Sequence, residues 1–138
     1  MMHEPESNRR LAKVLVVDDD RQLLWALNTR LSAIGCDCVA CSNASEAMVK
    51  LAVIPFDLVI TDMTMPGIDG LAIVAMIRSH SDVPIIVVTG HSAQYGPLIA
   101  AYQNVTLFPK PLEPAVFLAY VKSSLRKISS GRALLKYG

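Results

Sequence analysis

The sequence has no run of about eighteen apolar residues, so we expect no membrane-spanning helix. Its first ten residues, MMHEPESNRR, are polar, and three aspartates interrupt the apolar run that follows, so we expect no secretory signal. Neither sign of charge dominates, because 13 basic residues face 12 acidic ones. The chain therefore has no global field that attracts nucleic acid or an anionic membrane, and we expect a cytoplasmic protein with protein partners.

Cysteine is scarce as well, with only Cys36, Cys38 and Cys41 in the chain. A tetrahedral zinc site needs four ligands, and no histidine lies near these cysteines in the sequence. The alternative is that they are small buried side chains of one strand. In that case Cys36 and Cys38 share one face of the strand and Cys41 lies on the other.

Length and hydropathy are sufficient for one domain. The chain has 138 residues, of which 52% are hydrophobic, and its mean hydropathy is +0.39. Such a chain buries a sizeable core without disulfides or metals, but it leaves no room for a second folded domain. We expect a disordered arm at residues 1–10, a domain at 11–128 and a tail at 129–138, which is either frayed or an extension of the last helix.

Four short apolar runs each end in polar or turn-forming residues. Residues 14–17 lead into Asp18, Asp19 and Asp20, residues 58–61 into Asp62, residues 85–88 into Thr89 and Gly90, and residues 105–108 into Pro109, Lys110 and Pro111. Apolar runs of this length are typical of buried strands. In open α/β sheets, ligands bind outside the carboxyl ends of the strands. We therefore expect these acids, the hydroxyl and the ammonium to converge on one site.

Segments with helical spacing separate the apolar runs. The expected helices are 21–34, 43–52, 70–77, 97–103 and a last one from Pro114; the expected strands are 11–17, 37–41, 56–61, 84–88 and 105–108. This alternation predicts a parallel sheet with right-handed crossovers. The fourth helix is predicted to be short because Gly96 and Pro97 interrupt its pattern. Trp25 lies off the apolar stripe of the first helix and is predicted to be exposed.

The stretches VLVVDDD, LVITDMTMPGIDG, IIVVTG and FPKPL, in this order and at these separations, resemble the receiver domain of bacterial two-component response regulators. The resemblance extends from Lys13 to Lys127. It implies an α/β fold of the flavodoxin-like doubly wound kind, with five parallel strands in the order 2-1-3-4-5 and five helices.

The resemblance also assigns roles at the predicted site. Asp62 stands at the phospho-accepting aspartate, and Asp18 and Asp19 match the acidic pair. Three clustered carboxylates repel one another unless a cation joins them, and hard oxygen ligands suit Mg²⁺ or a similar divalent ion such as Mn²⁺. We expect Asp19 and Asp62 to bind the ion directly, Asp18 to bind it through water, and the backbone carbonyl of Thr64 to complete the protein's share.

Other positions flank the phosphoryl group or transmit its effect. During catalysis, Mg²⁺ and the Lys110 ammonium are expected to neutralise the phosphoryl oxygens, and the Thr89 hydroxyl is expected to donate a hydrogen bond to one of them. In receivers, the residue two positions after the aspartate, here Thr64, and the residue two positions after the threonine, here His91, flank the phosphoryl group, with Gly90 beside them. The resemblance further implies a cis peptide bond between Lys110 and Pro111, which directs the ammonium toward the site.

The sequence departs from the family pattern at Leu107. Many receivers carry Tyr or Phe three residues before the lysine, where it swings inward on phosphorylation. Phe108 is not a simple substitute, because the two-residue period of a strand places it on the opposite face.

The function implied is that of a stand-alone receiver that takes a phosphoryl group from a sensor histidine kinase or a histidine phosphotransfer protein. It then passes the phosphate on or docks on an unknown target protein. We expect no enzymatic activity beyond its own phosphorylation and dephosphorylation, no nucleic-acid or membrane partner, and a monomer.

Three alternatives remain. The chain could be a receiver cut from a longer regulator. It could be a magnesium-dependent phosphohydrolase with an aspartyl-phosphate intermediate, but such enzymes typically carry D-x-D on the first strand, which adjacent Asp18 and Asp19 do not match. A binding module without phosphorylation would require a missing site residue, and none is missing.

Overall fold

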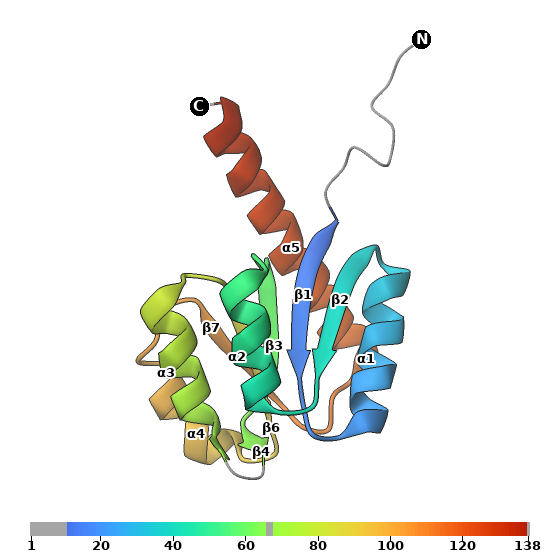
Figure 1. Ribbon diagram of the computed structural model, residues 1–138. Coiled ribbons are helices and arrows are strands. Elements are labelled where there is room, and N and C mark those ends of the chain that lie inside the picture. The colour runs from blue at the N-terminus through green and yellow to red at the C-terminus, as the bar shows by residue number, and fades with distance from the viewer. Residues whose placement is uncertain (1–10, 66–67, 138) are drawn as a thin grey trace.

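The computed structural model describes residues 11–65 and 68–137, and it shows a central sheet with helices on both faces (Figure 1). Five parallel strands form this sheet in the order β2-β1-β3-β6-β7. Their bounds are Ala12–Val17 (β1), Cys36–Cys41 (β2), Leu58–Asp62 (β3), Ile85–Thr89 (β6) and Val105–Pro109 (β7). Because β6 and β7 are the fourth and fifth strands of this sheet along the chain, the predicted order 2-1-3-4-5 is confirmed.

The helices are α1 (Arg21–Ala33), α2 (Ala44–Val53), α3 (Gly70–His80), α4 (Ser92–Ile99) and α5 (Pro114–Tyr137). A short antiparallel ribbon of β4 (Thr64–Met65) and β5 (Ile68–Asp69) follows β3, and the sequence did not predict it. No helix among the described residues is long and apolar enough to cross a membrane. The predicted arm at residues 1–10 lies outside the described residues.

Apolar side chains of the sheet pack on both of its faces. In β1, Val14 and Val16 join a core with α1 and α5, whereas Leu15 and Val17 join a second core with α2, α3 and α4. Burial on both faces explains why the central strands are nearly continuous apolar runs. Each fully buried aliphatic side chain of this kind contributes about 1.5–3 kcal/mol to the free energy of folding. The sheet is thus a rigid support for the residues at its ends.

Helix caps fix the first two crossovers. The Asp20 carboxylate accepts hydrogen bonds from the backbone N–H groups of Gln22 and Leu23, at 3.0 and 3.2 Å, and so caps α1. Asn43 caps α2 by accepting from the N–H of Glu46, at 2.9 Å. The Glu46 carboxylate accepts in turn from the N–H of Ser42, one residue before the cap. These two hydrogen bonds form a capping box in a slightly shifted form.

The three cysteines are packed as expected. Cys36 and Cys38 lie on the core with α1 and α5, and Cys41 lies on the other core. Burial raises the pKa of each thiol, that of Cys38 to about 12, so the thiolate form that binds metal is disfavoured. The prediction for Trp25 is also confirmed, because its side chain is 72% exposed.

The position of the fourth helix was predicted wrongly. The helix begins at Ser92, contains Pro97 and ends at Ile99, instead of spanning 97–103. Its first turn forms because the carbonyl of His91 accepts from the N–H of Tyr95, at 3.1 Å. Pro97 removes only one helical hydrogen bond, and Gly96 before it has no Cβ to clash with the proline ring. Ile99, the last residue of the helix, is buried in the core, which contributes about 1.5–3 kcal/mol in the opposite direction.

The last helix, α5, extends beyond the sheet on which it packs. It begins at Pro114, as predicted, and continues to Tyr137, so the described backbone after Lys127 is helical. Figure 1 shows its final turns extending past the end of the sheet where the chain enters β1.

Candidate functional site

The predicted site residues meet at the carboxyl edge of the parallel sheet. Val17 pairs with Thr61, Asp62 with Val88, and Thr89 with Pro109 in the strand register. Asp18 follows β1, Asp62 ends β3, Thr89 ends β6 and Lys110 follows β7. Because parallel strands share one direction, these four residues lie at one edge of the sheet.

Three carboxylates form a tight cluster at this edge. One oxygen from each of Asp18, Asp19 and Asp62 lies within 4.8 Å of the others. Asp18 and Asp62 are only 3% and 5% exposed, whereas Asp19 is exposed. A cluster of acids this close, and this poorly hydrated, stores electrostatic repulsion that a cation relieves.

Lys110 supplies part of that relief. Its Nζ lies 3.4 Å from Oδ2 of Asp62 and 3.6 Å from Oδ2 of Asp18, so one ammonium bridges two buried carboxylates. The backbone N–H of Lys110 donates to the carbonyl of Thr89 at 2.8 Å, which fixes the loop after β7 against β6. The bond between Lys110 and Pro111 is cis, as predicted.

The carboxyl of Asp18 has a raised pKa. Burial raises the pKa of its carboxyl to about 6, and the charges of Asp62 and Asp19 add to this increase. The N–H of Asp20, 2.9 Å from Oδ1 of Asp18, and the ammonium of Lys110 oppose it. One ammonium therefore does not compensate the three carboxylates. An oxygen-rich cluster with uncompensated negative charge fits a hard divalent cation.

Thr89 is held so that its hydroxyl proton is free for another acceptor. The residue is fully buried, and its Oγ1 accepts from the backbone N–H of His91 at 3.0 Å. A hydroxyl that accepts from a backbone amide still has one proton to donate. Gly90 and His91 are exposed beside it, and a Cβ at Gly90 would meet no heavy atom within 4 Å. Thr64 lies in β4, and its side chain is outside what the structure describes.

Leu107 and Phe108 take opposite faces of β7, as predicted. Leu107 packs on the core with α2, α3 and α4. Phe108 makes edge-to-face contacts on the other face, with ring centroids 5.3 Å from Phe117 and 5.0 Å from Tyr120. The aromatic side chain of β7 is therefore part of the core near α5, and it is not free to act as the usual switch.

Gly70 is a site residue that the sequence analysis missed. A Cβ at this position would overlap the carbonyl oxygen and Sδ of Met63 and lie 2.7 Å from the Cα of Met63. Because Met63 follows Asp62 directly, α3 begins in contact with the chain next to Asp62. The Asp-Gly pair before an apolar helix was a signal of a tight turn, but the sequence did not reveal what the turn touches.

Gly70→Ala is consequently expected to lower both stability and phosphoryl acceptance. The added methyl group must displace the Met63 backbone, and overpacking of this kind typically costs about 1–3 kcal/mol. Urea unfolding and a phosphorylation assay measure the two effects. Gly90→Ala is the matched control for stability, because Gly90 has no positive φ and a Cβ there meets nothing within 4 Å. Equal stability of Gly70→Ala and Gly90→Ala, with phosphoryl acceptance of the Gly70 variant at the wild-type level, would contradict this role.

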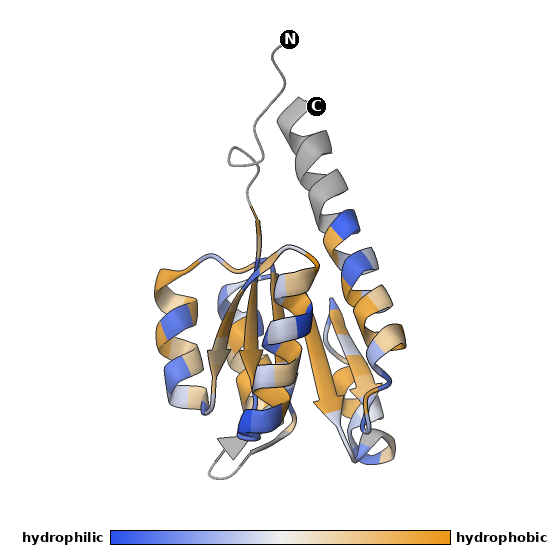
Figure 2. Ribbon diagram, turned by 90° about the vertical axis from the view of Figure 1, so that its right-hand side faces the viewer, coloured by the Kyte–Doolittle hydropathy of each residue, from blue (hydrophilic) through white to orange (hydrophobic). Residues whose placement is uncertain are grey.

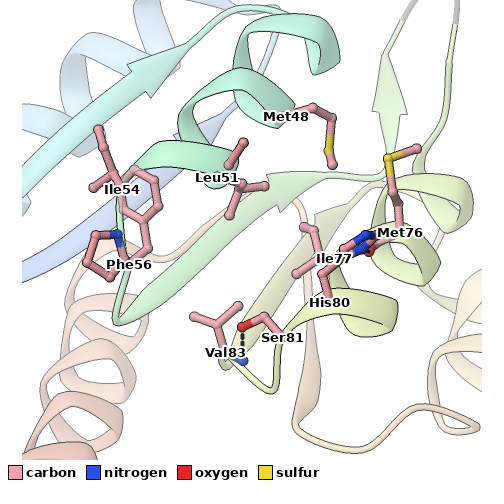
Figure 3. Close-up of a pocket in the computed structure, with 11 residues that line it drawn as sticks. Met48, Leu51, Ile54, Phe56, Met76, Ile77, His80, Ser81 and Val83 are labelled. Carbon is pink, nitrogen blue, oxygen red and sulfur yellow. Dashed lines mark hydrogen bonds between the residues drawn. The ribbon is translucent and has the colours of Figure 1, made fainter.

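A separate hollow lies far from the carboxylates. It has a volume of about 500 Å³ and lies between α2 and α3, near the amino ends of β3 and β6. Figure 3 shows Met48 and Leu51 facing Met76 and Ile77 across it, with His80 at its edge. Its lining contains no acid, lysine or arginine, so the chemistry belongs to the carboxyl edge of the sheet.

Comparison with known proteins gives a family match. The profile of the response regulator receiver domain matches residues 14–122. The DNA-binding transcriptional regulator NtrC of Salmonella typhimurium is 34% identical over 115 residues, which are 81% of this chain and 24% of that protein. The probable transcriptional regulator ycf27 of Cyanidium caldarium is 31% identical over 137 residues, covering 99% and 55%. The chain thus spans about a quarter to a half of the length of these relatives.

Solved structures agree on the fold. The chemotaxis response regulator CheY4 of Vibrio cholerae has a TM-score of 0.76 and 26% identity, over 83% of this chain and 99% of that one. The response regulator TrrA of Thermotoga maritima, solved in complex with Mg(2+)-BeF, has a TM-score of 0.68 and 28% identity, over 86% and 99%.

Proposed function

The chain belongs to the response regulator receiver domain family, and from this we propose that Asp62 accepts a phosphoryl group from a sensor histidine kinase or a histidine phosphotransfer protein. One observation carries the proposal: the buried carboxylate of Asp62 has the Lys110 ammonium at 3.4 Å and two further acids beside it. A nucleophile, a charge partner and a cation site are the parts that phosphoryl transfer requires.

The transfer forms one bond and breaks one bond. A carboxylate oxygen of Asp62 attacks phosphorus as the N–P bond of the donor phosphohistidine breaks, and the imidazole nitrogen keeps the electron pair. Lys110 then pairs with a phosphoryl oxygen instead of the free carboxylates. The Thr89 hydroxyl donates a hydrogen bond to another phosphoryl oxygen. Lys110 acts through its charge and Thr89 through its hydrogen bond, and neither forms a covalent bond.

Asp18, Asp19, Asp62 and the carbonyl of Thr64 are the proposed holders of Mg²⁺, or of Mn²⁺ in its place. The three carboxylates fit such an ion because their oxygens cluster within 4.8 Å of one another, and burial raises the pKa of the Asp18 carboxyl among them. When bound, the cation neutralises charge that develops on the phosphoryl oxygens. The Mg(2+)-BeF complex of the Thermotoga maritima relative supports this assignment.

Phosphate release from acetyl phosphate tests this function against the hydrolase alternative. A receiver is expected to accept one phosphoryl group per chain and then release phosphate slowly, below about 1 s⁻¹. A hydrolase would turn over in the range of ordinary enzymes, about 1–10³ s⁻¹. Sustained release in that range, absent from Asp62→Asn, would favour the hydrolase.

The output is proposed to be a complex with a different protein. Helix α4, SAQYGPLI, has no charged residue, so it cannot supply the ion pairs that specify a symmetric dimer across the face of α4, β7 and α5. We expect sedimentation velocity to show a monomer with and without Mg²⁺ and beryllofluoride. Conversion to a salt-sensitive dimer on activation would contradict this prediction.

A further inference from the structure

The two helices that cover one face of the sheet, α1 and α5, contain no acidic residue. Arg21 and Arg30 lie on α1, and Lys122, Arg126 and Lys127 lie on the described part of α5, where all three are exposed. The whole chain has a formal net charge of only +1, so the acids that balance these residues lie elsewhere. Figure 2 shows hydrophilic and hydrophobic residues alternating along α5. This face is locally basic although the protein is nearly neutral.

A hollow lies in this face, where α5 passes the end of α1. It has a volume of about 330 Å³, and its lining consists of Ala12, Ile34, Gly35, Cys36, Lys122, Leu125 and Arg126. Lys122 and Arg126 are four residues apart on α5, so they lie one above the other along the same side of the helix. The other lining residues are apolar or glycine. The hollow, which we call the basic groove, therefore combines an apolar floor with two cationic groups.

Among the residues whose side chains the structure describes, no acid neutralises either cationic group of the basic groove. Within residues 11–63 and 70–127, the ion pairs involve Lys13 and Lys110, and none involves Lys122 or Arg126. Charges at the rim of an apolar depression are the arrangement found at protein interfaces, where a charged partner adds specificity to an apolar centre.

We propose that the basic groove binds an acidic amphipathic segment of another protein. An apolar side chain of that segment would rest on Ile34 and Leu125, while carboxylates pair with Lys122 and Arg126. A polyanion is a poorer match, because nucleic-acid binding relies on phosphate contacts and gains little from an apolar floor. The small net charge of the chain also gives a polyanion no long-range attraction.

The basic groove is remote from the phosphorylation site. Its residues Ala12 and Cys36 begin β1 and β2, whereas Asp18 and Asp62 lie at the carboxyl ends of β1 and β3. A partner bound there leaves the carboxylates accessible to a phosphoryl donor. Binding is therefore expected to be the same with and without phosphorylation, which separates this inference from the proposed function.

Fluorescence anisotropy with a labelled peptide tests the inference. The probe is a synthetic helix with leucines along one side and glutamates along the other. Lys122→Glu with Arg126→Glu is expected to weaken its binding about tenfold, because two attractions become repulsions. Lys127→Glu is the matched control, since it reverses the same charge on the same helix outside the groove lining, and it should change the affinity less than about twofold. Asp62→Asn should bind as the wild type does.

Further probes separate the alternatives. A peptide with serines in place of leucines should lose binding, and unchanged binding would exclude a role for the apolar floor. No binding of the leucine peptide at low salt, or equal loss in the Lys127 control, would overturn the proposal. So would a single-stranded oligonucleotide or anionic vesicles that bind through Lys122 and Arg126 as tightly as the peptide. Circular dichroism and retained phosphoryl acceptance establish that the charge-reversal variant is folded.

Discussion

Asp62→Asn is expected to eliminate phosphoryl acceptance. An amide has nearly the size of the carboxylate but is a poor nucleophile, so the variant keeps the packing of β3 and loses the reacting oxygen. It also removes one of three carboxylates that repel one another, which is not expected to destabilise the fold. The loss of activity should therefore not result from unfolding. Separation of the phosphorylated and unphosphorylated chains on a phosphate-affinity gel, after incubation with acetyl phosphate and Mg²⁺, measures the effect.

Asp20→Asn provides the matched control for this experiment. It makes the same substitution at Asp20, the last aspartate of residues 18–20, which caps α1. Asparagine caps a helix as well as aspartate does. The control should accept a phosphoryl group as the wild type does. Equal labelling of Asp62→Asn and the wild type would assign the acceptor to another residue.

Asp18→Asn is expected to weaken Mg²⁺ binding and to stabilise the metal-free protein at neutral pH. Burial raises the pKa of the Asp18 carboxyl from 3.8 to about 6, so the folded chain binds more protons than the unfolded chain between these values. The wild type must therefore lose stability as pH rises through this window, by up to about 3 kcal/mol. Asparagine carries no such charge, so its advantage should grow with pH and level off above about pH 6.

Urea unfolding without Mg²⁺ at pH 4.5 and 7.5 measures this difference. A stability difference between Asp18→Asn and the wild type that does not change with pH would contradict the account.

In a Mg²⁺ titration followed by Trp25 fluorescence, we expect the variant to bind Mg²⁺ about 10–100-fold more weakly, because it loses a ligand that orders the coordinated water. Asp20→Asn lies outside the carboxylate cluster and should bind as the wild type does.

The parallel sheet and its active edge could be predicted from the sequence because their signals are local. Apolar runs such as 14–17 and 58–61 identify buried strands directly, and the parallel arrangement then brings Asp18 and Asp62 to one edge. The family resemblance supplied the roles of these acids and the cis bond before Pro111.

The errors arose where tertiary contacts outweighed local preference. Pro97 indicated a helix start, but burial of Ile99 and the small size of Gly96 allow the helix to continue through it. The contact between Gly70 and Met63 depends on two segments that touch only after folding, and no periodicity reveals it. The basic groove likewise needs Ile34, which follows α1, and Leu125 of α5 to be brought together, although they are far apart in the chain.

Intact-mass spectrometry of the wild-type chain, after incubation with acetyl phosphate and Mg²⁺, tests the central claim most directly. The account predicts the addition of one phosphoryl group, which is absent when a chelator removes the metal and absent from Asp62→Asn. An unchanged mass of a folded wild-type chain that binds Mg²⁺ would contradict the assignment of Asp62 as a working phospho-acceptor.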